Sequence, residues 1–211
     1  MNKEKKIFEQ IYSQTNAVWT REEPPQEVVE LIENKIIKPC KMLDVACGEG
    51  FQAIFFTKKG FDVLGIDLSE NAIEYARKNA HKAGVKVRFM VLDIDNLNHL
   101  NERFDFIFEW GLLHHLKIQN AWEKYVEAVN SVLNKGGKYL SMCFNDSSLE
   151  YKGKGSGYRS SPSGTKIYYS TQKELRELFK PYFKIIDEKL IHISGDKSPD
   201  HISNYFLMEK L

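Results

Sequence analysis

The sequence predicts an α/β fold, in which a mostly parallel sheet carries helices on both faces and ends in an antiparallel hairpin. Two observations support this. Short apolar runs, typical of strands, alternate with helical patterns between residues 41 and 144. The first run, Met42 to Val45, ends in a glycine turn, and the second, Val63 to Ile66, ends in Asp67. A strand, a glycine turn, a helix and a strand ending in an acid are typical of a nucleotide-binding unit.

The N-terminal part is predicted to be helical. Apolar residues at helical spacing indicate a short amphipathic helix around Ile7, Phe8, Ile11 and Tyr12. A second helix is expected after the proline pair at 24–25, because proline is favoured in the first helical turn.

The central part is predicted to alternate between strands and helices. The expected strands lie at about 41–46, 62–67, 86–92, 104–110 and 137–144. A helix at about 50–59 follows the first strand, and another at 119–133 precedes the fifth. Ser69 is expected to cap a helix that runs to about His81 and is ended by Gly84.

The C-terminal part changes in composition. Residues 145–170 are rich in glycine, serine and basic side chains and predict a long polar loop, either a lid or a surface insertion. Thr171 is expected to cap a helix at 172–180. Two closing strands, at about 182–192 and 202–209, are predicted to flank a turn at 195–199.

Composition excludes several classes of protein. The 211 residues carry 30 Lys and Arg against 29 Asp and Glu, a balance that gives no preference for nucleic acid or acidic membranes. Three cysteines, Cys40, Cys47 and Cys143, lack paired spacing, so neither a disulfide framework nor a zinc site is expected. No apolar run approaches the length of a membrane span, and the Lys-rich start lacks a signal sequence. A cytoplasmic location is therefore expected.

The glycine turn itself allows two cofactors. The stretch from Gly48 to Ala53 fits the dinucleotide pattern G-x-G-x-x-A, with Asp67 near the position of a ribose-binding acid. Asp44 and Glu49 argue against a dinucleotide, because carboxylates beside a pyrophosphate would repel it. The same carboxylates suit S-adenosylmethionine, which carries an ammonium, a sulfonium and a ribose diol.

Several motifs in order along the chain carry a family resemblance. Residues 43–50, Leu-Asp-Val-Ala-Cys-Gly-Glu-Gly, resemble motif I of the class I S-adenosylmethionine-dependent methyltransferases, D-x-G-x-G-x-G. Residues 65–69, 92–94 and 104–108 resemble the ends of strands two and three and the fourth strand of that family, and 133–139 its turn into strand five. The sequence departs from the pattern at Ala46, where the family most often has glycine.

The resemblance implies one methyltransferase domain over residues 1–211, with a Rossmann-like, seven-stranded, mostly parallel sheet. Within it, the chain is expected to divide into four parts with separate roles. These are an N-terminal helical lid (1–40), a cofactor-binding half (41–144), a lid loop (145–170) and a C-terminal helix and hairpin (171–211).

The resemblance also implies a set of cofactor-binding residues. Asp67 would accept the ribose hydroxyls, although it could instead cap a helix, and Asp93 would accept the adenine amino group or cap the next turn. Asp44 would act at the methionine ammonium, where Glu109 would offer its backbone carbonyl. The other members are the adenine walls Leu68 and Ile94, the turn residues Ala46, Cys47, Gly48 and Gly50, and the aromatic Trp19, for which core packing is the alternative.

Candidates for the acceptor side follow strand 104–110. Trp110, His114 and His115 would face the acceptor, and either histidine could serve as a base or belong to the structure. Arg159, in the polar loop, could attract a negatively charged acceptor. Cys47 is not expected to be a nucleophile, because no nearby base activates it, and no metal is expected.

The predicted reaction is in-line transfer of a methyl group from S-adenosylmethionine to a small nucleophilic acceptor, with S-adenosylhomocysteine as product. The protein would act mainly by alignment and by excluding water. A weaker resemblance to thiopurine and tellurite methyltransferases favours a small-molecule acceptor such as a thiol or an oxyanion. No nucleic-acid or membrane partner is expected, and a monomer is the default. A nicotinamide-dependent oxidoreductase and a non-catalytic cofactor-binding subunit remain as alternatives.

Overall fold

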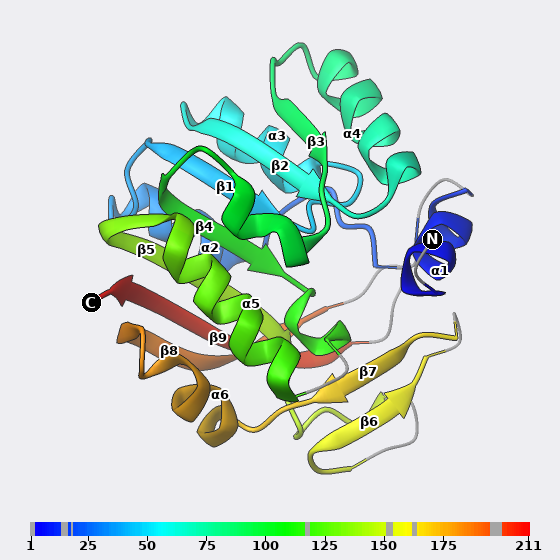
Figure 1. Ribbon diagram of the computed structural model, residues 1–211, viewed down its shortest axis with the longest axis vertical. Helices are drawn as coiled ribbons and strands as arrows, with labels where there is room; N and C mark the ends of the chain where they lie inside the picture. The colour runs from blue at the N-terminus through cyan, green and yellow to red at the C-terminus, as the bar shows by residue number, and fades with distance from the viewer. Residues whose placement is uncertain are drawn as a thin grey trace. The chain divides into compact units, whose positions relative to one another are not determined.

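A computed structural model describes residues 3–13, 17, 19–116, 119–150, 154–161, 164–194 and 200–211. These residues form two compact units, residues 1–93 and 94–211. The strands form a seven-stranded, mostly parallel sheet with a C-terminal antiparallel pair, and a separate two-stranded hairpin lies outside it. The predicted fold class is thereby confirmed (Figure 1). Among the described residues, no helix has the length and apolar character needed to cross a membrane.

The first unit is built around three parallel strands in the order β3-β2-β1. These are β1 (Lys41–Val45), β2 (Asp62–Asp67) and β3 (Arg88–Val91), and each lies within the predicted span. The connecting helices are α3 (Phe51–Lys58) and α4 (Glu70–Lys82). Met42, Leu43 and Val45 are fully buried, as expected for a parallel strand covered on both faces.

Two helices precede this sheet, as the sequence predicts. Helix α1 (Lys3–Tyr12) contacts α4 within the same unit, and α2 (Gln26–Glu33) begins directly after Pro25. The buried side of α1 ends in Tyr12, which packs with Ala17 and Ala72 in a small apolar cluster. Phe8, Ile11 and Trp19 cover the same cluster.

The second unit contains the other four strands, in the order β4-β5-β9-β8. β4 (Phe104–Trp110) pairs in parallel with β5 (Leu133–Phe144), and β5 pairs antiparallel with β9 (His201–Lys210). β8 (Phe183–Ile193) completes the hairpin with β9. The predicted turn of this hairpin, 195–199, lies outside the described residues.

The helices of this unit begin and end close to the predicted residues. They are α5 (Gln119–Val132) and α6 (Gln172–Phe179). Two short 3-10 helices, η1 (Ile94–His99) and η2 (Leu113–His115), are not predicted from the sequence. Thr171 caps α6 as predicted, because its hydroxyl accepts the N–H of Glu174 while the Glu174 carboxylate accepts the N–H of Thr171.

The segment predicted as a long polar loop contains a hairpin. β6 (Gly157–Ser160) pairs antiparallel with β7 (Lys166–Tyr169), and Tyr158 lies opposite Tyr168. The two tyrosine rings meet edge to face at 4.9 Å. Cross-strand aromatic pairs of this kind stabilise a hairpin even where glycine and serine dominate the sequence. Residues 157–160 and 166–169 therefore differ from the irregular loop that the composition predicts.

Candidate functional site

The glycine turn after β1 is held in a conformation that L-residues rarely adopt. Ala46, Gly48 and Gly50 have φ angles of 57°, 52° and 79°. Gly50 admits no side chain, since an added Cβ would lie 2.8 Å from the Cβ of Ala76. Ala46 adopts the same left-handed region at a cost that glycine would not carry, which explains why the related motif most often has glycine there.

Asp67, the last residue of β2, organises this turn. One of its carboxylate oxygens accepts the N–H of Gly48 at 2.9 Å, and the other accepts the N–H of Ser69 at 2.9 Å. Burial raises the pKa of Asp67 to about 6, although both hydrogen bonds oppose that rise. Each oxygen retains a lone pair, so the carboxylate can still accept ribose hydroxyls.

Asp44 lies inside β1 with little exposed surface. One of its carboxylate oxygens is buried and has no hydrogen-bond partner in the described part of the chain. Burial, and then the charge of Asp67, raises the pKa of Asp44 to about 8, while the N–H of Ala53 acts in the opposite direction. A buried carboxylate oxygen without a partner is costly, and a ligand ammonium would relieve that cost.

Cys47 has the properties expected of a packing residue. Its N–H donates to the carbonyl of Ile66 at 2.9 Å, as part of the turn. Burial, followed by the charges of Asp44 and Asp67, raises the pKa of the thiol well above its ordinary value. The thiolate needed for nucleophilic attack is therefore disfavoured.

The N-terminal segment contributes Tyr12 and Thr20, which the sequence pattern did not single out, beside the predicted Trp19. A Cβ on Gly48 would lie 2.8 Å from the hydroxyl oxygen of Tyr12, so Tyr12 closes one side of the glycine turn. Trp19 supports this tyrosine, because its indole N–H donates to the Tyr12 hydroxyl at 3.0 Å. The hydroxyl of Thr20 donates to the carboxylate of Glu49. The only indication of this role for Tyr12 in the sequence is that it is an aromatic residue at the end of a predicted amphipathic helix.

The remaining predicted cofactor residues lie at the ends of β2 and β3. Leu68 and Ile94 are half-buried, and Asp93 follows β3 and is also half-buried. Lys5 of α1 lies near Asp93, whose charge contributes to the raised pKa of the Lys5 ammonium after that of its main partner, Glu70.

In the second unit, Glu109 is completely buried near the end of β4. One oxygen accepts the N–H groups of Leu112 and Leu113 at 2.8 and 3.0 Å, and the other accepts the hydroxyl of Ser141 at 2.7 Å. Burial raises the pKa of Glu109, and these donors act against that rise. The side chain therefore holds the turn that leads into η2.

His114 and His115 lie on that turn, and half-buried Trp110 precedes it. The two imidazole rings are 4.5 Å apart, and His114 also contacts the ring of Phe144. Burial lowers the pKa of His114 well below its ordinary value and that of His115 to about 4, so both rings are neutral at pH 7. The Nδ1 atom of His114 is buried and without a hydrogen-bond partner among the described residues.

Arg159, the predicted acceptor contact in the polar segment, is buried in β6. Its guanidinium donates to four backbone carbonyls, those of Asp146, Ser148, Glu150 and Gly155. It also stacks on the ring of Tyr169, with its central carbon 3.6 Å from the ring centroid. These contacts favour a role in shaping the segment before β6 over direct contact with an acceptor.

Part of the chain is similar to known methyltransferases. Residues 42–137 match the family model described as a methyltransferase domain. The chain is 36% identical over 73 residues to the probable S-adenosyl-L-methionine-dependent methyltransferase TehB of Haemophilus influenzae, covering 35% of this chain and 25% of that protein. It is 29% identical over 118 residues to the ubiquinone biosynthesis O-methyltransferase of Coxiella burnetii, covering 56% of this chain and 49% of that protein. The chain thus spans half or less of the length of these curated relatives.

A solved structure resembles the whole chain in fold. The 1,6-didemethyltoxoflavin-N1-methyltransferase of Burkholderia thailandensis, with bound 1,6-didemethyltoxoflavin and S-adenosylhomocysteine, superposes with a TM-score of 0.76 at 21% identity. The match covers 98% of this chain and 86% of that one. Residues 42–137 are thus similar to a methyltransferase domain, in agreement with the class that the sequence predicts, and the solved structure supports the fold. The oxidoreductase and the non-catalytic subunit gain no support.

Proposed function

We propose that this protein transfers the methyl group of S-adenosylmethionine to a small-molecule acceptor. The observation that carries the proposal is the acidic turn after β1, where Asp44 has a buried oxygen without a partner in the described part of the chain and Asp67 lies at the end of β2. A ligand with an ammonium group and a ribose diol satisfies both carboxylates, whereas a pyrophosphate would meet repulsion. S-adenosylmethionine supplies a methyl group that its sulfonium already activates.

Each cofactor residue has a proposed task. Asp67 accepts the ribose hydroxyls, and Asp44 and the backbone carbonyl of Glu109 act at the ammonium. Asp93 accepts the adenine amino group. The apolar residues Leu68 and Ile94 flank the adenine, while the turn from Ala46 to Gly50, together with Trp19, shapes the site. We propose that residues 1–211 act as one methyltransferase domain.

The acceptor is proposed to be small and nucleophilic in its own right. The neutral rings of His114 and His115 offer hydrogen-bonding positions rather than positive charge, and Arg159 is engaged by backbone carbonyls. Two proteins similar to this chain bear names that point to small molecules, ubiquinone biosynthesis and 1,6-didemethyltoxoflavin. Catalysis would then rest on alignment and water exclusion more than on a strong base.

A product screen tests the proposal. The purified protein is incubated with S-adenosylmethionine and a panel containing a thiol, an oxyanion, a phenol and an amine, and methylated products are identified by mass spectrometry. We expect a methylated small molecule, and His114→Ala and His115→Ala, made singly, should each slow turnover by less than about 100-fold. A larger loss from one histidine, with cofactor binding intact, would mark it as a base for a hydroxyl or amine acceptor. Methylation confined to RNA, DNA or protein would contradict the small-molecule acceptor.

The working environment is proposed to be the reducing cytoplasm, with the protein acting as a monomer and without nucleic-acid or membrane partners. Among the described residues, Cys40, Cys47 and Cys143 form no disulfide, which is compatible with a reducing compartment.

A further inference from the structure

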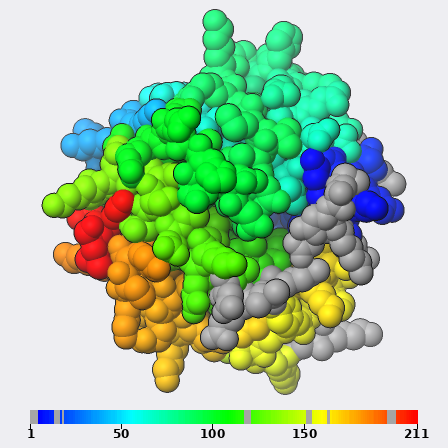
Figure 2. Space-filling model, viewed as in Figure 1, coloured from blue at the N-terminus to red at the C-terminus, as the bar shows by residue number. Residues whose placement is uncertain are grey.

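Three polar side chains of helix α1 reach the glycine turn after β1 or the first turn of α4. Lys5, Glu9 and Tyr12 follow one another at intervals of four and three residues, so they lie along one face of the helix. Tyr12 reaches the glycine turn, and Lys5 forms an ion pair with Glu70 at 2.9 Å. The helix lies at the surface of the unit, where its atoms are visible beside those of α4 (Figure 2).

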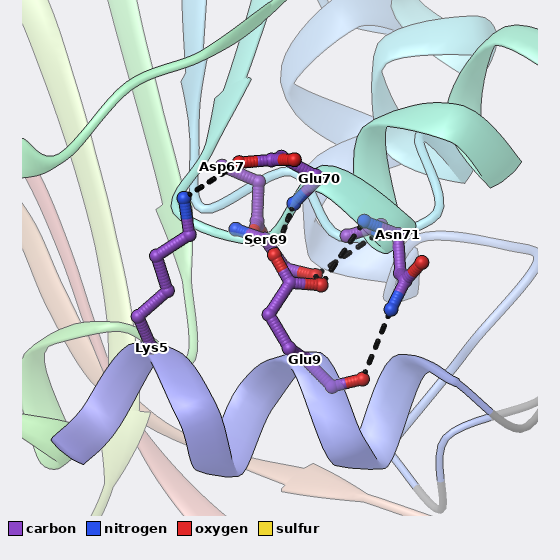
Figure 3. A network of polar contacts seen from close by, with 7 residues as sticks. Lys5, Glu9, Asp67, Ser69, Glu70 and Asn71 are labelled. Atoms are coloured by element: carbon purple, nitrogen blue, oxygen red, sulfur yellow. Dashed lines mark hydrogen bonds and ion pairs between the residues drawn. The ribbon is translucent and has the colours of Figure 1, made fainter. Parts of the chain in front are cut away.

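Glu9 caps the first turn of α4 from this separate helix. One of its carboxylate oxygens accepts the N–H of Glu70 at 2.7 Å. The other accepts the hydroxyl of Ser69 at 2.9 Å and the N–H of Asn71 at 3.2 Å. Figure 3 shows the side chain rising from α1 into this turn, with the Asn71 amide returning a bond to the Glu9 carbonyl. A carboxylate in this place satisfies N–H groups that the helix itself cannot pair.

The same turn carries the ribose-binding carboxylate. The N–H of Ser69 donates to Asp67, while the Ser69 hydroxyl donates to Glu9 and accepts the N–H of Ala72. Ser69 is fully buried, so its hydroxyl has little freedom to reorient. Glu9 is thus linked through one residue to the carboxylate that is expected to bind the cofactor.

We propose that Glu9 is a positioning residue for the cofactor, which fixes the turn that presents Asp67 and thereby makes docked α1 part of the binding site. The inference rests on the proposed function, because it assumes that Asp67 accepts the ribose. Glu9 acts on Asp67 in two ways, by holding the backbone from residue 69 to residue 71 and by placing a negative charge nearby.

The negative charge of Glu9 should change the pKa of Asp67, an effect that a purely structural role would not produce. Burial raises the pKa of Asp67, and the charge of Glu9 adds to that rise, against the hydrogen bonds from Ser69 and Gly48. Burial also raises the pKa of Glu9, but the donors of the α4 turn outweigh it and lower that pKa overall, so Glu9 is ionised at neutral pH. Asp44, Glu49, Cys47 and Tyr12 are the other titratable groups around the glycine turn. Removing the charge of Glu9 should therefore lower the pKa of Asp67.

Calorimetric titration with S-adenosylhomocysteine between pH 5 and pH 8.5 tests the proposal, with three variants of the full chain. Glu9→Gln removes the charge and one acceptor, and we expect affinity to fall by about tenfold at pH 7.5. The ratio to wild type should shrink toward pH 5, because Asp67 stays ionised to lower pH in the variant. Glu9→Asp keeps the charge but is one methylene shorter, so its loss should be similar at every pH. Glu74→Gln is the matched control, because it makes the same charge change at an exposed position of α4 that pairs with Lys78 and not with α1, and its affinity should stay within about twofold of wild type.

Circular dichroism establishes that each variant is folded before its affinity is compared. Wild-type affinity and pH dependence in Glu9→Gln would overturn the inference, and so would a loss in Glu9→Gln that is the same at every pH. If the wild-type protein itself failed to bind S-adenosylhomocysteine, the proposed function would be wrong, a result distinct from failure of the Glu9 proposal alone.

Discussion

Both units bury carboxylates at strand ends, but the hydrogen bonding of these groups differs. In the second unit, Glu109 receives donors on both oxygens and fastens the turn before η2. In the first unit, one oxygen of Asp44 has no partner among the described residues, and the carboxylate of Asp67 accepts backbone N–H groups, among them those of Gly48 and Ser69. Burial alone therefore does not identify a ligand site. The unpartnered oxygen of Asp44, beside the carboxylate of Asp67, favours the proposed cofactor site, since a ligand can supply a donor that the described part of the chain does not.

The largest effect expected from this comparison is on cofactor binding. Asp67→Ala should lose roughly 2–4 kcal/mol of S-adenosylhomocysteine binding, because two ribose hydroxyls lose a charged acceptor. Isothermal titration calorimetry measures the loss. Asp62→Ala, at the exposed start of the same strand, is the control and should bind like wild type. Unchanged affinity in Asp67→Ala would break the distinction between ligand-binding and structural carboxylates.

Substitution of Glu109, by contrast, should lower the stability of the fold. Glu109→Ala leaves the N–H groups of Leu112 and Leu113 and the Ser141 hydroxyl without their acceptor, which should cost roughly 2–3 kcal/mol in the free energy of unfolding. Urea denaturation followed by circular dichroism measures it. Asp105→Ala, on the exposed side of β4, should change stability far less. A Glu109→Ala protein as stable as wild type would show that the bonds to Glu109 do not hold this turn.

The ionisation of Asp44 and Asp67 makes both the stability of the free protein and its cofactor affinity depend on pH, which sharpens the comparison. The pKa of Asp67 is about 6 and that of Asp44 about 8, both above the ordinary value for an aspartate. The folded protein therefore binds these two protons more tightly than the unfolded chain does. The stability that the two protonated groups contribute to the free protein is complete only at low pH and is lost as pH rises through 6 and then 8. S-adenosylhomocysteine prefers both carboxylates ionised, so its affinity should rise over the same interval.

Thermal unfolding at fixed, saturating S-adenosylhomocysteine measures this effect. A roughly tenfold gain in affinity between pH 5.5 and pH 8.5 adds about 1.4 kcal/mol, or about 2–6 °C to the ligand-induced rise in Tm. Asp44→Asn should flatten the upper part of the curve. A ligand-induced rise that does not vary with pH would argue against ionisable carboxylates at the cofactor.

The smallest effect concerns Ala46. Its φ of 57° strains an L-residue, so Ala46→Gly should raise the free energy of unfolding by about 1 kcal/mol. Lys35→Gly offers a matched comparison, because exposed Lys35 has a φ of 58° and lies between α2 and β1, outside the turn. Urea denaturation of both variants decides the point. If Lys35→Gly stabilises the protein and Ala46→Gly does not, strain at Ala46 is absent or is offset within the turn.

The sequence predicts features that depend on residues close together in the chain better than features that depend on residues far apart in it. The strand at 104–110 and the cap at Thr171 appear where expected, because apolar runs and capping residues act locally. The hairpin at 157–169 is missed, since its tyrosine pair and the contacts of Arg159 outweigh a glycine- and serine-rich composition.

The candidate site shows the same division. Motif spacing predicts Asp44 and Asp67, which lie on two paired strands separated in the chain by one short helix. Glu9 is missed because a glutamate on the polar side of a helix resembles any solvated residue, and its partners at 69–71 are about 60 positions away. Tyr12 is predicted as an apolar face residue, and only the folded chain brings its hydroxyl to the turn at Gly48.

The most direct test of the central claim compares two ligands on the wild-type protein. Calorimetry at pH 7.5 with S-adenosylhomocysteine and with NAD asks whether the acidic turn selects a cationic adenosine ligand over a pyrophosphate. We predict binding of S-adenosylhomocysteine at one molecule per chain and weak or no binding of NAD. Tight binding of NAD without any response to S-adenosylhomocysteine would contradict the account.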